Sequence, residues 1–183
     1  MLFRKRHSGA TDTELVSLVA KGSESAFKEL LDRHQGAVYQ LAYRFLGDPS
    51  EAEDIAQETF LRLYRAADRY KPRASLRTYV FRIAKNLCID FLRKKRPEPM
   101  AHLPETMNQD SPLDHLERSQ TMQITLDAID ALPENQRMAI LLRHNSGCRY
   151  KEIADIMELT VSAVESLLVR ARKTLRQRLA AVR

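Results

Sequence analysis

A proline-rich stretch slightly past the middle of the chain limits what the chain can fold into. Residues 96–114 read RPEPMAHLPETMNQDSPLD, with four prolines and no apolar period. Proline lacks a backbone donor and disfavours helical geometry in the residue before it, so no long helix can run through this stretch. We therefore expect residues 97–112 to be a flexible linker that separates two modules.

Apolar residues on both sides of the linker recur at steps of three and four, which is typical of amphipathic helices. Capping and stop signals predict helices over residues 11–21, 25–46, 48–68, 75–95, 113–132, 133–146, 150–157 and 161 onward. We find no strand pattern. The expected fold class is all-α, with two small helical domains at residues 11–96 and 113–183 and a flexible N-terminus at residues 1–10.

Charge is segregated along the chain, whose formal net charge is +6. Residues 62–96 hold twelve Lys and Arg against two acids, and residues 170–183 hold six cations and no acid. Residues 97–134 reverse this balance, with eight acids and one cation. The basic segments favour an anionic partner such as nucleic acid.

Cysteine and histidine usage argues against a metal site. Cys88 and Cys148 are the only cysteines and are isolated, which predicts buried thiols in a reducing compartment, and the five histidines are scattered. We expect no metal and no cofactor. The N-terminus lacks the apolar run of a secretory signal, and no stretch approaches a membrane span, so a cytoplasmic location is expected.

The segment after the linker has the layout of a helix-turn-helix, with Ile153, Ala154 and Met157 facing inward and a turn at residues 158–160. The Thr160 hydroxyl can cap the second helix. Its predicted apolar stripe is Val164, Leu168, Ala171, Leu175 and Leu179. The opposite face carries Ser162, Glu165, Ser166, Val169, Lys173 and Arg176. Short polar groups followed by long cations suit base edges and then phosphates; the alternative is a solvated helix in a bundle.

Two helices before the linker present different outer faces. In residues 76–95 the predicted buried stripe is Leu76, Val80, Ile83, Leu87 and Phe91, and the predicted outer side is Thr78, Tyr79, Arg82, Lys85, Asn86, Ile89 and Arg93. Cations around an aromatic ring suit an unpaired nucleic-acid strand, although a merely solvated basic face would look the same.

The preceding helix is expected to bury Ala52, Ile55, Ala56, Leu63 and Ala67. Its outer side would present Asp54, Gln57, Glu58 and Leu61. An acidic strip with one exposed leucine favours docking to a protein over binding to nucleic acid; a plain charged helix face is the alternative.

Three motifs in this order resemble an extracytoplasmic-function (ECF) sigma factor of bacterial RNA polymerase, over about residues 11–179. DPSEAEDIAQETFLRLYRA is similar to region 2.2, and SLRTYVFRIAKNLCIDFLRKKR is similar to regions 2.3 and 2.4. LPENQRMAILLRHNSGCRYKEIADIMELTVSAVESLLVRARKTL is similar to region 4.

The resemblance implies that the chain binds core RNA polymerase and recognises −10 and −35 promoter elements. Core polymerase would be contacted through its β′ clamp helices by Asp54, Gln57, Glu58 and Leu61. The −10 DNA would meet Lys71, Arg73, Ser75, Tyr79, Arg82, Lys85, Asn86 and Arg93, with residues 71–75 holding a flipped base. The −35 DNA would meet Thr160, Ser162, Glu165, Ser166, Val169, Arg170, Lys173 and Arg176. The region-4 part would also touch the β flap of the polymerase. The acidic linker would thread toward the path of the RNA in the polymerase. An anti-sigma factor, often membrane-anchored, would hold the free protein.

The chain departs from the family pattern at five positions and in the loop KPRAS at residues 71–75, which lacks the small, acidic character often seen there. Tyr79 stands where tryptophan is usual and Leu76 where phenylalanine is common. Glu158 replaces a frequent turn glycine, which predicts strain if its φ is positive. Glu165 and Leu167 replace residues that are usually basic. Glu165 is expected to accept a hydrogen bond from a cytosine amine, or else to pair with Arg172 or an adjacent side chain and only set geometry. Leu167 is expected to widen the core or cost a phosphate or flap contact.

Three other functions fit the sequence less well. A helix-turn-helix regulator that acts without polymerase would need no acidic docking helix. An enzyme would need a phosphate loop, paired catalytic carboxylates or a nucleophile with its base, and the sequence shows none of these. A pure interaction protein would not need basic faces in both modules.

Overall fold

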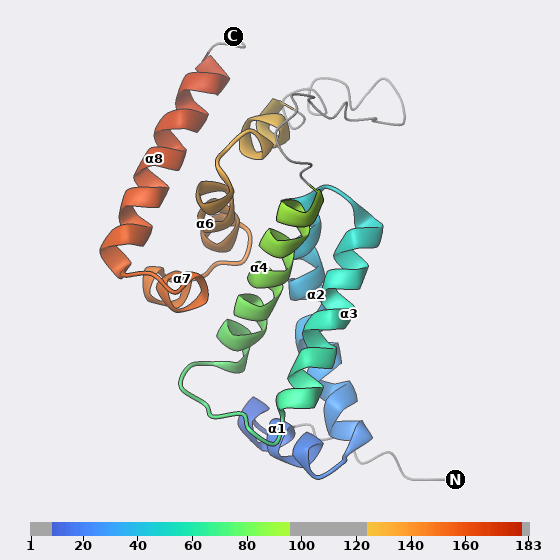
Figure 1. The fold of residues 1–183 in the computed structure, drawn as a ribbon. Coiled ribbons are helices and arrows are strands. Elements are labelled where there is room, and N and C mark those ends of the chain that lie inside the picture. Colours follow the sequence, from blue (N-terminus) through green and yellow to red (C-terminus); the bar gives the residue numbers. More distant parts are fainter. Residues whose placement is uncertain (1–8, 96–123, 181–183) are drawn as a thin grey trace.

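The computed structural model describes residues 9–95 and 124–180, which form helices joined by short turns (Figure 1). The first part contains α1 (Asp12–Ala20), α2 (Glu24–Leu46), α3 (Pro49–Ala66) and α4 (Leu76–Lys95). The second contains a helix over residues 124–130, then α6 (Glu134–His144), α7 (Tyr150–Met157) and α8 (Val161–Ala180). The described residues contain no strand, and the expected all-α fold class is confirmed. The predicted linker, residues 1–8 and the first half of the helix expected at 113–132 lie outside the described ranges.

Side-chain caps set the helix boundaries close to their predicted positions. The Thr11 hydroxyl accepts a hydrogen bond from the Glu14 amide at 3.3 Å, and the Glu14 carboxylate accepts one from the Thr11 amide at 2.7 Å. Gly47 ends α2 in the left-handed conformation, with φ 76°, which glycine adopts without steric cost. One Asp48 carboxylate oxygen then accepts from the amides of Ser50 and Glu51 at the start of α3.

The core of the first part lies between α2, α3 and α4. Phe45, Leu30 and Leu63 are wholly buried, and Phe81 of α4 is 1% exposed. In α3 all five residues predicted to be inside are buried: Ala52, Ile55, Ala56, Leu63 and Ala67. The second part packs Met138, Ile153 and Leu168 into its own interior.

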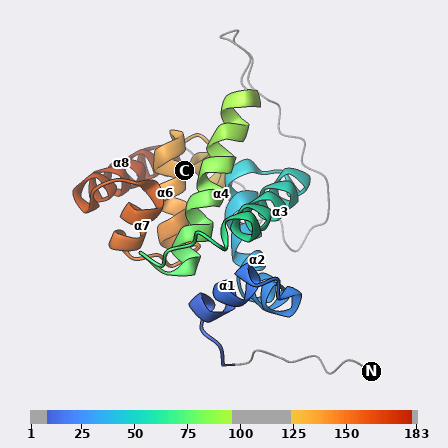
Figure 2. The same ribbon diagram turned by 60° about the horizontal axis from the view of Figure 1, so that its bottom comes forward.

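Helix α4 is covered on two sides, which the sequence did not predict. It lies between α2 and α3 on one side and α6 and α7 on the other in both views (Figures 1 and 2). Thr78 and Lys85, expected on the outer face, are therefore only 4% and 7% exposed, and that part of the prediction is wrong. Ile83 and Phe91 of the predicted stripe are half-buried, whereas Leu76, Val80 and Leu87 are buried as expected.

Candidate nucleic-acid and protein interfaces

A groove of about 500 Å³ runs between α2 and α3 and brings together all four residues predicted to dock on a protein. Asp54, Gln57, Glu58 and Leu61 line it from α3, and Leu61 is 42% exposed. The Glu58 carboxylate pairs with Arg62 at 2.7 Å on the same helix. The groove therefore combines an acidic rim with an exposed apolar side chain.

The opposite wall of this groove was missed by the sequence analysis. Phe27 and Leu31 of α2 line it, and Phe60 contributes from α3. Phe27 also meets the Tyr64 ring edge-on, with ring centroids 5.2 Å apart. The four-residue step from Phe27 to Leu31 was a usable signal, because such residues share one helix face.

A second pocket, of about 190 Å³, lies where the α3–α4 loop meets the start of α4. Four of the predicted −10 residues line it together: Lys71, Arg73, Tyr79 and Arg82. Arg69 and Tyr70 line it as well and were not predicted. The pocket thus carries four cationic side chains and two tyrosine rings.

The two tyrosines of this pocket hold each other in place. The Tyr70 and Tyr79 rings meet edge-on at 5.2 Å, and the Arg82 guanidinium lies 5.8 Å from the Tyr79 ring centroid. Burial raises the pKa of Tyr70 above its ordinary value. Cationic groups beside aromatic faces can bind a phosphate and stack on a base.

The remaining predicted −10 residues lie outside the pocket. Ser75 caps α4 by accepting from the Thr78 amide at 3.1 Å, and Asn86 is exposed on the same helix. Arg93 is exposed in the last turn, about 20 Å along the helix from Tyr79 at 1.5 Å per residue. Lys85 is buried against the helix-turn-helix.

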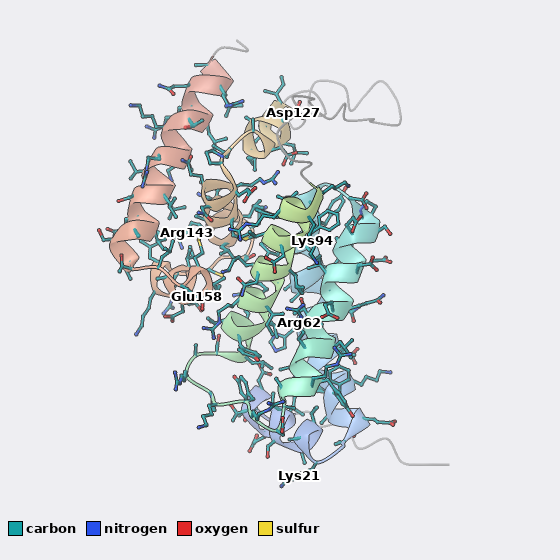
Figure 3. All side chains as sticks on the ribbon, viewed as in Figure 1. Lys21, Arg62, Lys94, Asp127, Arg143 and Glu158 are labelled. Atoms are coloured by element: carbon teal, nitrogen blue, oxygen red, sulfur yellow. The ribbon has the colours of Figure 1, made fainter. Side chains whose placement is uncertain are left out.

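The turn between α7 and α8 is built as the sequence indicated. Glu158 has φ 58°, so a non-glycine residue occupies the left-handed region, and the Thr160 hydroxyl caps α8 by accepting from the Ala163 amide at 3.2 Å. The Glu158 carboxylate lies 3.9 Å from Arg82 and 3.7 Å from Lys85, both on α4. Glu158 itself is labelled in Figure 3. These contacts across the two parts were not predicted.

Every residue predicted to read −35 DNA is exposed: Thr160, Ser162, Glu165, Ser166, Val169, Arg170, Lys173 and Arg176. Val169 is 63% exposed, which is unusual for a valine, whereas Val164, Leu168 and Ala171 are fully buried. Glu165 has no ion pair within residues 9–95 and 124–180, so the expected alternative of a pair with Arg172 is absent there. Leu167 is half-buried against the core, as the wider-core interpretation requires.

The described ranges offer neither a metal site nor a membrane span. No group of three or more His, Cys, Asp and Glu side chains there could hold a metal ion. Within the same ranges no helix is both long and apolar enough to cross a membrane. Cys88 and Cys148 are buried free thiols, as expected.

Comparisons with known proteins agree with this geometry. Residues 30–98 match the family Sigma-70 region 2, and residues 122–175 match Sigma-70, region 4. The ECF RNA polymerase sigma factor SigW of Bacillus subtilis is 32% identical over 90% of this chain and 94% of its own length. The ECF RNA polymerase sigma-E factor of Escherichia coli K12 is 34% identical over 90% of this chain and 92% of its own length.

Solved structures extend the likeness to the arrangement of both parts. CnrH, in complex with the cytosolic domain of CnrY, superposes with a TM-score of 0.72 at 28% identity, covering 93% of this chain and 97% of CnrH. The sigma factor RpoE of Bartonella quintana, in complex with the anti-sigma factor NepR, gives a TM-score of 0.64 at 26% identity, covering 86% of this chain and 98% of RpoE. A regulator that acts without polymerase is disfavoured, because the region-2 match covers the part that such a regulator would lack. The chain therefore belongs to the ECF family of RNA polymerase sigma factors, and its function is to direct transcription initiation at promoters.

Proposed function

We propose that three separate surfaces carry this function: the α2–α3 groove docks on core polymerase, the pocket at the start of α4 binds the −10 strand, and α8 reads the −35 duplex. The observation that carries the proposal is the pocket, which joins four cationic side chains to two tyrosines beside an exposed loop. The domains would be residues 11–96 and 113–183, joined by the acidic linker at 97–112. No catalytic reaction is assigned to the chain.

The groove suits the β′ clamp helices because it offers one apolar anchor inside an acidic rim. Leu61 stands exposed beside Phe27 and Leu31, and Asp54, Gln57 and Glu58 surround it. Interfaces commonly place such an anchor at the centre and charged groups at the edge. A partner helix with apolar and basic side chains would complement this groove.

The pocket suits an unpaired base of the −10 element. Tyr79 offers a ring for stacking, while Lys71, Arg73 and Arg82 can neutralise phosphates on either side. Extruding a base costs a few kcal/mol, and stacking inside a fitted pocket offsets that cost. The tyrosine presents less stacking area than the tryptophan usual in the family.

Tyr79→Ala tests the pocket in the holoenzyme. We expect open complexes to fall about five- to tenfold, because one stacking platform is lost. A stack is worth about 1–3 kcal/mol, and the lower end of that range, which corresponds to this change, suits a half-buried ring. Permanganate reactivity of unpaired thymines on a promoter would measure the opening. Tyr79→Phe, which keeps the ring, is the matched control; equal opening in wild type and Tyr79→Ala would contradict the assignment.

Glu165→Gln tests the reading face of α8. A carboxylate can accept a hydrogen bond from the N4 amine of cytosine, whereas an amide prefers adenine. We expect the base preferred at one −35 position to change. A specific side-chain contact favours the correct base over the others by about 1–3 kcal/mol. Transcription from a library of promoters randomised at the −35 element would reveal the preference. Glu165 would have no reading role if both proteins select the same sequences with equal yield.

The regulatory partner follows from the solved relatives. CnrH and the Bartonella RpoE are each described in complex with a second protein, in the latter case the anti-sigma factor NepR. We infer that this chain is likewise held by an anti-sigma factor in the cytoplasm, and that the factor can tether it to the inner membrane. The β flap would be the second contact with polymerase, made by the region-4 part.

A further inference from the structure

The contact between α4 and the helix-turn-helix covers part of the surface that the proposed function assigns to −10 DNA. Lys85 lies in the middle of that surface and is only 7% exposed. A lysine that neutralises a phosphate must be reachable by the strand. In this arrangement the chain cannot use Lys85 to bind DNA.

The Glu158 carboxylate lies close to two cationic side chains of α4, those of Arg82 and Lys85. Its carboxylate oxygens lie 3.9 Å from the Arg82 guanidinium and 3.7 Å from the Lys85 ammonium. Figure 3 shows Glu158 at the end of α7, on the side that faces α4. Burial lowers the pKa of Lys85, and the nearby Glu158 carboxylate works against that shift by favouring the charged lysine.

The turn itself does not call for a carboxylate at this position. Glu158 has φ 58°, a conformation that glycine or asparagine adopts at lower cost. The side chain neither caps a described helix nor fills a core, and it is 58% exposed. The polar contacts described for the Glu158 side chain are those with α4. The contact between the two parts therefore explains why an acidic residue stands at this strained position.

Two further contacts join the two parts. The Arg77 guanidinium of α4 donates a hydrogen bond to the carbonyl of Ser146, in the loop between α6 and α7. The Arg137 guanidinium of α6 lies 4.5 Å from the centroid of the Phe45 ring of α2. These contacts hold the second part against α4 and α2 and leave the outer face of α8 free.

We propose that Glu158 takes the place of a DNA phosphate within the free chain, holding the helix-turn-helix on α4 so that Arg82 is paired and Lys85 is concealed until the two parts separate. The inference rests on the proposed −10 role of α4. It predicts a selective effect, because the pocket at Tyr79 stays partly open and Val169 on α8 stays 63% exposed. Binding of unpaired strand is reduced in the closed chain, whereas binding of duplex by α8 is not.

Glu158→Asn in the full chain removes the charge and keeps a residue that tolerates the left-handed turn. We expect the free protein to bind a fluorescent single-stranded oligonucleotide about two- to fivefold more tightly, since partly exposed ion pairs contribute modestly and the apparent dissociation constant scales inversely with the open fraction. Asp155→Asn removes an exposed acid from α7, three residues before Glu158, and is the matched control. Affinity for a duplex of the same length should change equally in both variants.

The two native cysteines report separation of the parts directly. Burial raises the pKa of Cys88 to about 12, so its thiol reacts slowly at neutral pH, and the Arg137 charge from the other part also acts on it. Cys148 is buried too, and the Arg77 charge of α4 acts on its pKa. We expect iodoacetamide to alkylate Cys88 and Cys148 about two- to fivefold faster in Glu158→Asn than in wild type or Asp155→Asn, in proportion to the open population.

The two readouts separate the possible failures. Unchanged alkylation would overturn the inference, because Glu158 would then not hold the parts together. Faster alkylation with unchanged oligonucleotide affinity would also overturn it, and would show that the concealed face of α4 is not a DNA surface. If Tyr79→Ala impairs promoter opening while Glu158→Asn changes neither readout, the proposed function stands and only the Glu158 contact fails.

Discussion

Leu61→Ala is expected to weaken binding of the chain to core RNA polymerase about thirtyfold. Leu61 is 42% exposed at the centre of the α2–α3 groove, where Phe27 and Leu31 form an apolar wall beside it. Truncating a central anchor of an interface costs about 2 kcal/mol or more, which corresponds to this change in affinity. Titration of core enzyme with the labelled chain would measure it.

The control for Leu61 is another exposed hydrophobic residue outside the groove. Tyr43 of α2 is 41% exposed and does not line the groove, so Tyr43→Ala removes a comparable side chain there. We expect Tyr43→Ala to bind core enzyme as wild type does. Equal losses in both variants would mean that the groove is not the docking centre, and no loss in either would remove Leu61 from the interface.

Phe45→Ala is expected to have the largest effect on stability. Phe45 is wholly buried near the end of α2, and the Arg137 guanidinium of α6 packs over its ring, 4.5 Å from the centroid. Replacing a buried phenylalanine by alanine costs about 3–5 kcal/mol, because transfer energy is lost and a cavity remains. That loss is a large share of the 5–15 kcal/mol typical of a folded domain. Urea unfolding followed by circular dichroism would measure the change in unfolding free energy.

Phe45→Leu separates loss of volume from loss of the ring. Leucine keeps most of the apolar volume, so we expect it to lose less than half as much unfolding free energy as alanine. The ring contact with Arg137 is lost in both variants. A loss below about 1 kcal/mol for Phe45→Ala would contradict the packing of this core.

The interior of α3 was predictable because a single face of that helix is buried. Ala52, Ile55, Ala56, Leu63 and Ala67 recur at helical spacing, and every one is inside. The caps at Thr11 and Asp48 were equally visible, since both act on residues within one turn of the chain. Helix caps depend on residues that are close together in the sequence, so they can be predicted from the sequence alone.

The second buried side of α4 could not be predicted in this way. Thr78 and Lys85 look solvent-facing by periodicity, yet α7, more than fifty residues further along the chain, covers them. The missing turn glycine pointed to a strained Glu158 on the condition that its φ is positive, as it is, but its partners Arg82 and Lys85 belong to the other part. Periodicity gives the face on which a residue lies and not what is packed there.

The residues that the sequence analysis missed at the candidate sites were missed for the same reason: their role depends on packing between separate segments. Phe27 and Leu31 were expected in a helix, but only the packing of α2 on α3 shows that they wall the groove holding Leu61. Tyr70 directly precedes the predicted loop and reaches the pocket because its ring meets Tyr79. The groove and the pocket are therefore both completed by residues that are close to the predicted ones in space and could be identified only from the structure.

The enclosure of α4 has a consequence for how this helix can vary in evolution. One side fills the core with residues such as Phe81, a second meets the helix-turn-helix through Lys85, and the loop-proximal end supplies Tyr79 to the pocket. A substitution on α4 therefore has to satisfy packing, the contact between the parts and DNA binding together. In a saturation mutagenesis experiment selected for transcription, α4 should accept fewer substitutions per position than α8, whose outer face is solvent-exposed along its length.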